Sequence, residues 1–337
     1  MAKRSIDVAT LLEFFSDLFA DGSPMPDYQA ARHTTACVVR AAIIPLPRHA
    51  TGGESYAVIY GNRSMPDCMV THTWGALFLH LVAAVVADAL GLQDYRNVAN
   101  ELALRMGEQE ALWKVLRDRG VLHRKYWICC FCVNQHTCIC AGFAPEPPLN
   151  SPEHARWEAT RRDPVTKIVW ACCKCPEPKH FNDSPGCEMN KFDSMMALLH
   201  AEVRHFTQVV FVDVGLTVFD RIWCIAELVQ CYNSGIPQRV CHYSSDVLDV
   251  DNEDLTVYQK IMGLKVSDCS AARPEDRAHI LAKIDDTAAF ESQLRWIIFG
   301  DRGLGATMFG LDAMEVAAHC AYRSVAIHRS NSSFPSV

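Results

Sequence analysis

One stretch, residues 208–230, constrains the fold more than any other part of this chain. It opens with an uninterrupted run of β-branched and aromatic residues that ends at Asp213. Such a short apolar run is typical of a strand buried on both faces, as in a parallel sheet. Beyond Gly215, with Asp220 as the predicted N-cap, apolar residues recur at helical spacing. The stretch therefore predicts a core strand followed by a helix.

Similar apolar runs recur along the chain, and helical patterns separate them. Strands are predicted over residues 68–71, 126–133 and 239–243, and helices over residues 77–92, 97–119 and 193–206. Strands that alternate with helices build a parallel sheet, because each connection crosses over one face of the sheet. The predicted fold class is therefore α/β, doubly wound, with a mainly parallel sheet of the flavodoxin-like kind.

The segments on either side of this unit show helical patterns without strands. Residues 7–20 and 28–42 predict helices, so residues 1–64 are expected to form an N-terminal helical extension. Residues 65–245 are expected to form the α/β domain, with a Cys-rich insertion over residues 136–190. Residues 246–337 are predicted to be a helical C-terminal extension, with helices over residues 254–264, 290–299 and 312–326 and one that begins near Pro274.

Charge and apolar patterning argue against two classes of partner. The formal net charge of −7 does not suit nucleic-acid binding through a basic field. The longest apolar run, residues 77–92, carries His80 and Asp88 and is too short to span a bilayer. Acidic residues interrupt the N-terminal segment, so no secretory signal is predicted. A cytoplasmic or nuclear location is expected, with neither nucleic acid nor membrane as a partner.

The sixteen cysteines are interpreted as thiols and metal ligands, because disulfides are rare inside cells. Zinc needs four nitrogen or sulfur donors, usually two close pairs that a loop brings together. We predict a structural zinc held by Cys173, Cys175 and Cys187, with the fourth ligand from His136, Cys140 or His180. Cys129, Cys130 and Cys132 lie in a predicted strand, where free cysteine packs as a small apolar residue.

A carboxylate and an aromatic ring share one face of the helix that follows the strand ending at Asp213. Trp223 and Glu227 are four residues apart, and open α/β sheets bind ligands near such helices. The alternative is a surface glutamate packed against a tryptophan. Further polar or aromatic residues are expected at the same sheet edge, namely His72, Thr73, Trp74, Asn134, Gln135, Asp213 and Arg221. For His72 and Trp74 the alternative is packing between the first helix and the sheet.

The run Trp-Cys-x-x-Glu-Leu over residues 223–228, preceded by a buried strand, resembles the signature of plant-type TIR domains. The similarity extends to residues 69–74 and 195–206, and the chain also resembles uncharacterised proteins of unicellular algae. Three features differ from the family. The loop after the first strand reads His72-Thr73-Trp74-Gly75, the loop after the second strand carries a long Cys-rich insertion, and Arg221 stands where the family usually has a small polar residue. In that family the glutamate of this motif is the catalytic residue of an NAD-cleaving site. The resemblance therefore implies a TIR-like fold, NAD as substrate and Glu227 as catalytic residue, with Trp223 and Cys224 beside it.

Two functions are left open. In the first, the protein is a TIR-like NAD-cleaving enzyme or signalling domain, in which Glu227 stabilises the oxocarbenium-like transition state as nicotinamide leaves. Trp74 would stack on a flat ring of a nucleotide-type molecule, and His72 and Arg221 would anchor it. In the second, the protein is a non-catalytic, zinc-stabilised binding or assembly module with the same fold. Association with a second copy of the chain is a further expectation. The absence of Gly-x-Gly-x-x-Gly and Walker sequences disfavours dehydrogenases and P-loop ATPases.

Overall fold

The computed structural model describes residues 1–49, 52–104, 110–181, 184–244 and 263–299. The helix predicted over residues 312–326 lies outside these ranges, and so does almost all of the helix predicted over residues 254–264.

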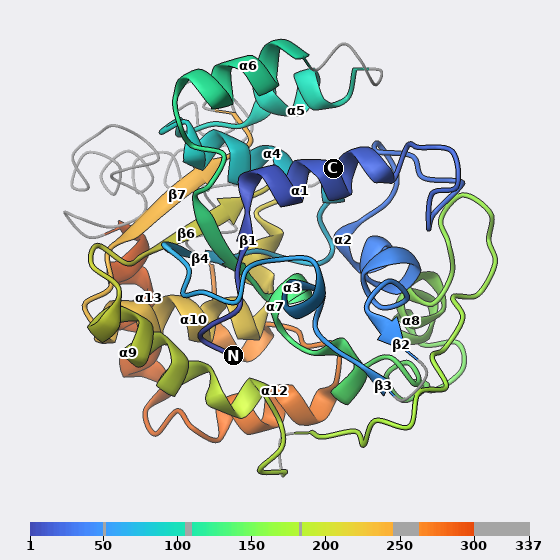
Figure 1. The fold of residues 1–337 in the computed structure, drawn as a ribbon. Helices are drawn as coiled ribbons and strands as arrows, with labels where there is room; N and C mark the ends of the chain where they lie inside the picture. Colours follow the sequence, from blue (N-terminus) through green and yellow to red (C-terminus); the bar gives the residue numbers. More distant parts are fainter. Residues whose placement is uncertain (50–51, 105–109, 182–183, 245–262, 300–337) are drawn as a thin grey trace, which may run out of the picture.

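A five-stranded sheet runs through the middle of the molecule (Figure 1). Its order is β1 (Ile6–Asp7), β5 (Lys125–Ile128), β4 (Cys68–Thr71), β6 (Thr207–Val212) and β7 (Gln238–His242). The last four strands are mutually parallel, and β1 joins the edge antiparallel to β5. The prediction of a mainly parallel sheet in an α/β fold is therefore confirmed.

The order of the strands reverses at β4. This first parallel strand lies between the second, β5, and the third, β6, so that Val70 pairs with Ile128 on one side and with Val209 on the other. The chain thus builds the sheet first toward one edge and then toward the other. The carboxyl end of β4, at Thr71, is the point where open α/β sheets bind ligands.

The second predicted strand is shorter than residues 126–133. β5 ends at Ile128, and a single helical turn, α7 (Cys129–Cys132), follows it. Beyond Ile128 neither β4 nor the two-residue β1 pairs with the chain. The backbone then bonds within itself, as Val133 N–H donates to Cys129 O at 3.0 Å. The prediction of a strand through Val133 was wrong for this reason.

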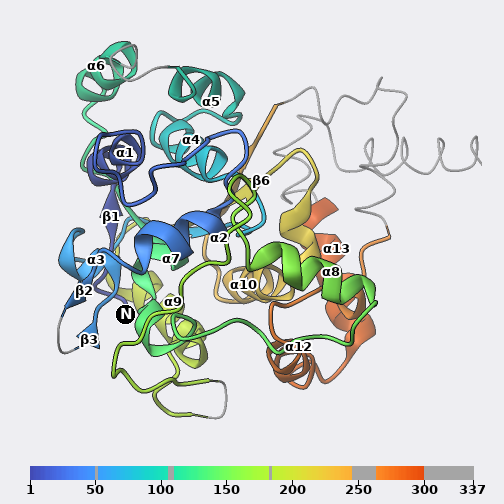
Figure 2. The ribbon, with the colours of Figure 1, turned by 90° about the vertical axis from the view of Figure 1, so that its right-hand side faces the viewer.

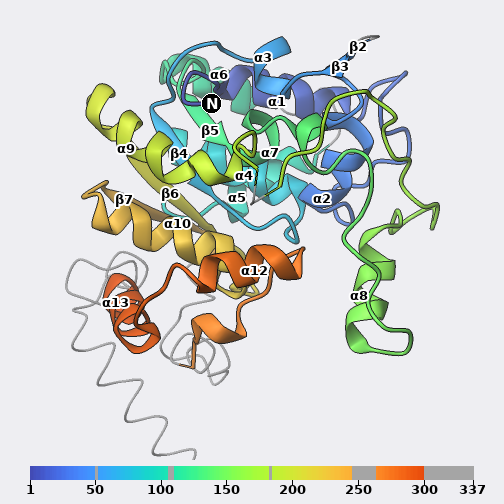
Figure 3. The same cartoon turned by 90° about the horizontal axis from the view of Figure 1, so that it is seen from below.

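Helices cover both faces of the sheet (Figures 1 and 2). One face carries α1 (Val8–Asp17), α4 (Phe78–Ala89), α5 (Arg96–Leu102) and α6 (Glu110–Asp118). The other carries α9 (Phe192–Glu202) and α10 (Ile222–Asn233), against which α12 (Pro274–Leu281) and α13 (Thr287–Phe299) pack (Figure 3). The helix predicted over residues 97–119 is divided into α5 and α6. Between α7 and α9 the one α-helix of the described residues is α8 (Pro152–Thr160), which lies away from the sheet.

The N-terminal segment differs in part from its prediction. α1 forms as expected, and the Asp7 side chain caps it by accepting from Thr10 N–H. The single helix expected over residues 28–42 is wrong: only α2 (Thr35–Val38) and a π-helical turn (Val39–Ile43) form. Before them, His33 Nδ1 accepts from Gln29 N–H at 2.8 Å, so a side chain takes a backbone donor. Three short elements follow, β2 (Arg48–His49), β3 (Gly52–Gly53) and α3 (Tyr56–Ile59).

The protein has two buried apolar cores, and the first includes side chains from both faces of the sheet, such as Phe78 of α4 and Phe192 of α9. Phe14 of α1 packs edge to face on Phe78 and on Phe131 of α7, so the N-terminal segment completes the first core. In the second core, Leu294 and Ile297 of α13 are buried with side chains of β6, β7 and α10. Within the described ranges, no helix has the length and apolarity to cross a membrane.

Candidate functional site

Glu227 lies on α10, opposite the carboxyl end of β4. Its Oε2 accepts a hydrogen bond of 2.6 Å from Thr71 Oγ1, and Thr71 Oγ1 in turn accepts from Gln208 Nε2 at 2.7 Å. The residue as a whole is partly buried. Burial of the carboxyl raises the pKa of Glu227 to about 8, although the hydrogen bond from Thr71 opposes this. The predicted catalytic residue is therefore a carboxyl group that takes up a proton near neutral pH.

Two thiols interact electrostatically with this carboxyl, those of Cys129 at the start of α7 and Cys224 on α10, and His72 and Trp74 lie beside Cys129. Trp74 Nε1 donates to Cys129 Sγ at 3.3 Å, and His72 Nε2 lies 4.0 Å from the same sulfur. Cys224 Sγ donates to the backbone oxygen of His72 at 3.4 Å. Burial lowers the pKa of His72 to about 4 and raises the pKa of both thiols. At neutral pH these neighbours are uncharged, so Glu227 lacks a cationic partner among them.

Only some of the predicted ligand-binding residues join this group. His72 and Trp74 lie beside Cys129, as expected for the loop after β4. Trp223, which was expected to flank Glu227, packs against the second core. Thr73 is buried, and its hydroxyl accepts from Gly75 N–H at 3.2 Å.

Asp213 and Arg221 have other partners in the structure. The Asp213 carboxylate accepts from the backbone N–H and the hydroxyl of Thr217, at 2.7 and 2.8 Å. Arg221 donates from Nη1 to Ser270 Oγ at 3.2 Å, and its backbone pairs with the same residue. Asp220, predicted as the N-cap of α10, belongs to the preceding 3-10 turn (Thr217–Asp220), and Arg221 occupies the cap position.

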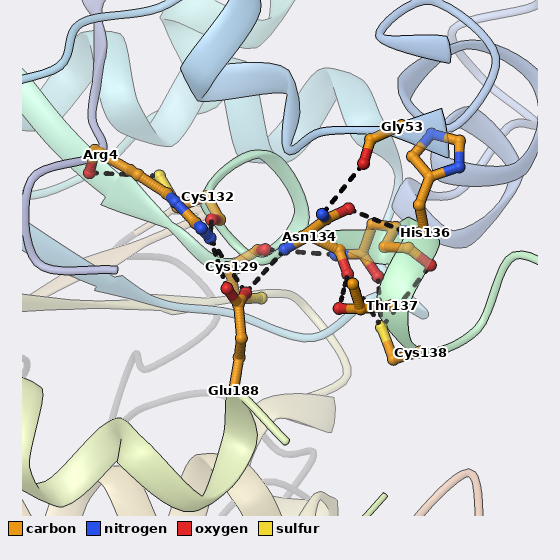
Figure 4. Close-up of polar contacts among 10 residues, drawn as sticks. Arg4, Gly53, Cys129, Cys132, Asn134, His136, Thr137, Cys138 and Glu188 are labelled. Atoms are coloured by element: carbon orange, nitrogen blue, oxygen red, sulfur yellow. Dashed lines mark hydrogen bonds and ion pairs between the residues drawn. The ribbon is translucent and has the colours of Figure 1, made fainter. Parts of the chain in front are cut away.

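Asn134 and Gln135 form a buried turn after α7 instead of an open binding surface, and Figure 4 shows Asn134 with its partners. Asn134 Nδ2 donates to Gly53 O at 3.1 Å, and its Oδ1 accepts from the backbone of His136 at 3.0 Å. Gln135 Nε2 donates to the carbonyls of Cys129 and Cys130. Both side chains thus hold the backbone of this turn, which leads from Cys129 toward His136.

Four potential metal ligands converge next to this turn. Nitrogen or sulfur atoms of His136, Cys140, Cys173 and Cys175 all lie within 4.8 Å of one another. The sulfurs of Cys140 and Cys175 are 3.6 Å apart, and Cys173 Sγ is 3.7 Å from His136 Nδ1. A zinc tetrahedron with bonds of about 2.0–2.3 Å has edges of about 3.3–3.8 Å. The Cys140–Cys175 and Cys173–His136 spacings fit a tetrahedral metal ion.

The surroundings of this group complement bound metal and thiolates. Lys179 Nζ lies 3.5 Å from Cys175 Sγ and donates to His136 O at 2.6 Å. Zinc with three thiolates and one imidazole carries a net charge of −1, which this ammonium offsets. The pKa of Cys175 is lowered: burial opposes the shift, but hydrogen bonds from Glu177 N–H and Lys179 favour the thiolate. Cys173 N–H donates to Cys140 O at 2.8 Å, which joins the two ligand pairs.

The grouping differs from the predicted ligand set in one respect. His136, Cys140, Cys173 and Cys175 come together, but Cys187 and His180 lie outside the group. Cys187 is buried with its N–H donating to Ser184 O, and His180 Nδ1 is 2.9 Å from Ser184 Oγ. The sequence holds a signal for the observed set, because His136 and Cys140 form one close pair and Cys173 and Cys175 a second.

Comparison of the chain with protein-family models, with curated proteins and with solved structures gave no match. Function is therefore argued from the chemistry of the two sites, since a fold does not determine an activity.

Proposed function

We propose that this protein is a TIR-like enzyme that cleaves the N-glycosyl bond of NAD, with Glu227 as its catalytic residue. The observation that carries the proposal is the carboxyl group of Glu227, which is held by Thr71 at the reversal point of the sheet with its pKa raised to about 8. Strongly shifted pKa values are concentrated at functional sites. The order of the parallel strands, second-first-third-fourth along the chain, agrees with the flavodoxin-like arrangement that TIR-like domains share.

The proposed reaction requires the ionised carboxylate of Glu227, not its protonated form. When the bond between ribose C1′ and the pyridinium nitrogen breaks, its electron pair stays on nitrogen and nicotinamide leaves as a neutral base. No proton is required for departure, and positive charge develops on the ribosyl group, as in glycosidase transition states. The Glu227 carboxylate would stabilise that charge and accept a proton from the water that attacks C1′. The products are nicotinamide, ADP-ribose and a proton.

Incubation of the full-length protein with NAD, followed by quantification of free nicotinamide, tests this proposal. Glu227→Gln keeps the shape of the side chain but cannot ionise, so it should abolish release. The exposed Glu202 of α9 provides a matched control, and Glu202→Gln should keep wild-type activity. Equal nicotinamide release by wild type and Glu227→Gln would refute the role of Glu227.

We also propose that the metal held by His136, Cys140, Cys173 and Cys175 is a structural zinc. Three thiolates and one imidazole are a ligand set that zinc favours, and four protein ligands leave no position for a reactive water. A metal analysis that returns one zinc per chain would support it. Well under one zinc per chain, in protein purified without chelator, would contradict it.

One observation favours the second function, a non-catalytic assembly module stabilised by this zinc. Thr73, Asn134 and Gln135, which were expected to contact a nucleotide, use their side chains to hold the backbone. A module of this kind would bind NAD weakly or not at all, and it would release no nicotinamide. The incubation with NAD therefore separates the two functions.

A further inference from the structure

Glu227 is the last of four side chains in a row that crosses the sheet beneath α10. Gln238 of β7 donates from Nε2 to Gln208 Oε1 at 2.7 Å. Gln208 of β6 donates from Nε2 to Thr71 Oγ1 at 2.7 Å, and Thr71 of β4 donates to Glu227 Oε2 at 2.6 Å. Three adjacent strands thus each contribute one polar side chain to a path that ends on the carboxyl group.

The direction of each hydrogen bond follows from the far end of the row. Gln238 Nε2 lies 3.0 Å from the backbone carbonyl of Leu228, which can only accept. The NH₂ group of Gln238 must therefore face this carbonyl, and the Gln208 atom beside it must be the amide oxygen. The NH₂ group of Gln208 then faces Thr71. Since the Thr71 oxygen accepts that bond, its own proton is directed to Glu227.

Because this row is buried, its polar side chains lower the stability of the core unless they are hydrogen-bonded. Gln208 is fully buried inside an apolar strand, where an amide is unfavourable unless both of its ends are bonded. Both ends are bonded here, to Gln238 and to Thr71. An apolar residue at the position of Gln208 would suit the core of the sheet better, unless the orientation of the Thr71 hydroxyl matters.

We propose that Gln238, Gln208 and Thr71 are positioning residues that fix Oε2 of Glu227 as a hydrogen-bond acceptor and reserve Oε1 for the substrate. Among the described residues, the bond from Thr71 is the one hydrogen bond of the Glu227 side chain. The residue is partly exposed, and Oε1 is the carboxyl oxygen that no described residue binds. The inference rests on the proposed NAD cleavage and adds to it the atom that takes the proton of the attacking water.

Other titratable groups near Glu227 do not compete with it at neutral pH. Cys129 of α7 and Cys224 and Cys231 of α10 interact electrostatically with Glu227, and burial raises the pKa of all three thiols. The pKa of His72, after β4, is lowered by burial to about 4. The positive charge of Arg221, which precedes α10, opposes the rise in the pKa of the Cys224 thiol. On β6 and β7 the row presents only the neutral amides. A carboxyl that titrates near pH 8 in this group is therefore Glu227.

Infrared difference spectroscopy of the full-length protein tests the row without any substrate. The C=O band of the protonated carboxyl, assigned by its loss in Glu227→Gln, is followed against pH. Thr71→Val removes the donor, and we expect the band to titrate about one pH unit higher, because a hydrogen bond to a charged group favours its ionised form. Thr71→Ser restores the hydroxyl and should return the wild-type midpoint. Gln208→Met frees the Thr71 hydroxyl to turn away and should also raise the midpoint.

A matched control lies outside the row. The Thr217 hydroxyl also donates to a carboxylate, that of Asp213, so Thr217→Val should leave the Glu227 band unchanged. If Thr71→Val and Thr71→Ser titrate alike at the wild-type midpoint, the positioning role is refuted, even if both variants are less stable. If the midpoints move as expected but the wild type releases no nicotinamide, the positioning role stands and the proposed NAD cleavage fails.

Discussion

The raised pKa of Glu227 predicts that the protein loses stability as the pH rises from about 5 to 8. In the unfolded chain this carboxyl has its ordinary pKa of 4.5, and in the folded protein its pKa is about 8. Between these values the folded state holds a proton that the unfolded state has released. The free energy of unfolding therefore falls with increasing pH, by about 1.4 kcal/mol per unit. From pH 5.5 to pH 8 the loss is about 3 kcal/mol, and the partial exposure of the residue makes this an upper value.

Glu227→Gln isolates this contribution. The amide cannot ionise, and its oxygen can accept from Thr71 as the carboxyl does, so packing and hydrogen bonding are retained. We expect the variant to be more stable than the wild type by about 1 kcal/mol at pH 5.5 and by up to about 4 kcal/mol at pH 8. Urea unfolding of both proteins at the two pH values, followed by tryptophan fluorescence, gives the four free energies. The variant-minus-wild-type difference in the free energy of unfolding is then compared between pH 5.5 and pH 8. In this comparison the contributions of the other titrating groups cancel.

The unfolding of Glu202→Gln and Glu227→Gln together tests whether the pKa of Glu227 is raised in the folded protein. Glu202→Gln, at an exposed position of α9, should follow the wild type at both pH values. If Glu227→Gln also follows it, the carboxyl ionises normally in the folded protein. The burial of Glu227 against Thr71 would then be wrong, and the pH dependence expected for catalysis would be lost with it.

Three further predictions concern the two sites. Because the proposed mechanism uses the Glu227 carboxylate, kcat/KM for NAD should rise about tenfold per pH unit from pH 6 to 7 and level off above pH 8, and a profile that is flat over this range would contradict the assignment. Cys175→Ser should lower bound zinc well below one per chain in a metal analysis, whereas Cys187→Ser should keep it, and the opposite result would restore the ligand set predicted from sequence. Gly53→Ala should also lose zinc, because a Cβ there would lie 2.3 Å from the His136 ring, whereas Gly142→Ala meets open space and should retain it.

Local sequence patterns were sufficient to predict most of the parallel sheet. The strand at β6 and the helix α10 were found because an apolar run and a helical period are properties of neighbouring residues. The edge strand β1 and the turn α7 were missed for a different reason. β1 has only two residues and depends on pairing with β5, and α7 forms where the neighbouring strands stop. Such features depend on contacts between segments far apart in the chain.

The candidate site shows the same division. Glu227 was predicted from its motif, but Thr71, Gln208 and Gln238 were not, because none of them belongs to a local motif: Thr71 ends β4, Gln208 lies near the start of β6, and Gln238 begins β7 beside Arg239. The signal that identifies them is their register: Thr71 pairs with Val210, and Gln208 pairs with both Met69 and Gln238. The metal group was predicted as a type, but its members depend on the backbone bond between Cys173 and Cys140. Spacing alone could not provide that bond.

The end of β5 shows why the two sites are difficult to treat separately. Gln135 holds the carbonyl of Cys129, whose thiol is next to Glu227, and Asn134 holds the backbone of the metal ligand His136. Glu188 accepts from Asn134 N–H and from Arg4, which ties the same turn to the N-terminal segment (Figure 4). A metal ion held by His136 would therefore also help to fix the thiol beside the carboxyl. Through this link the proposed zinc would have a structural role in either function.

The enzyme and the assembly module share the fold, the metal group and the core, and they differ at one atom. In the enzyme Oε1 of Glu227 meets a substrate, whereas in the module it has no partner. A carboxyl held at a pKa of about 8 lowers the stability of the folded protein at neutral pH, and substitution by glutamine would remove that cost. Destabilising groups of this kind are retained where catalysis needs them. A module gains nothing from the cost, so the row of side chains that orients Glu227 favours the enzyme.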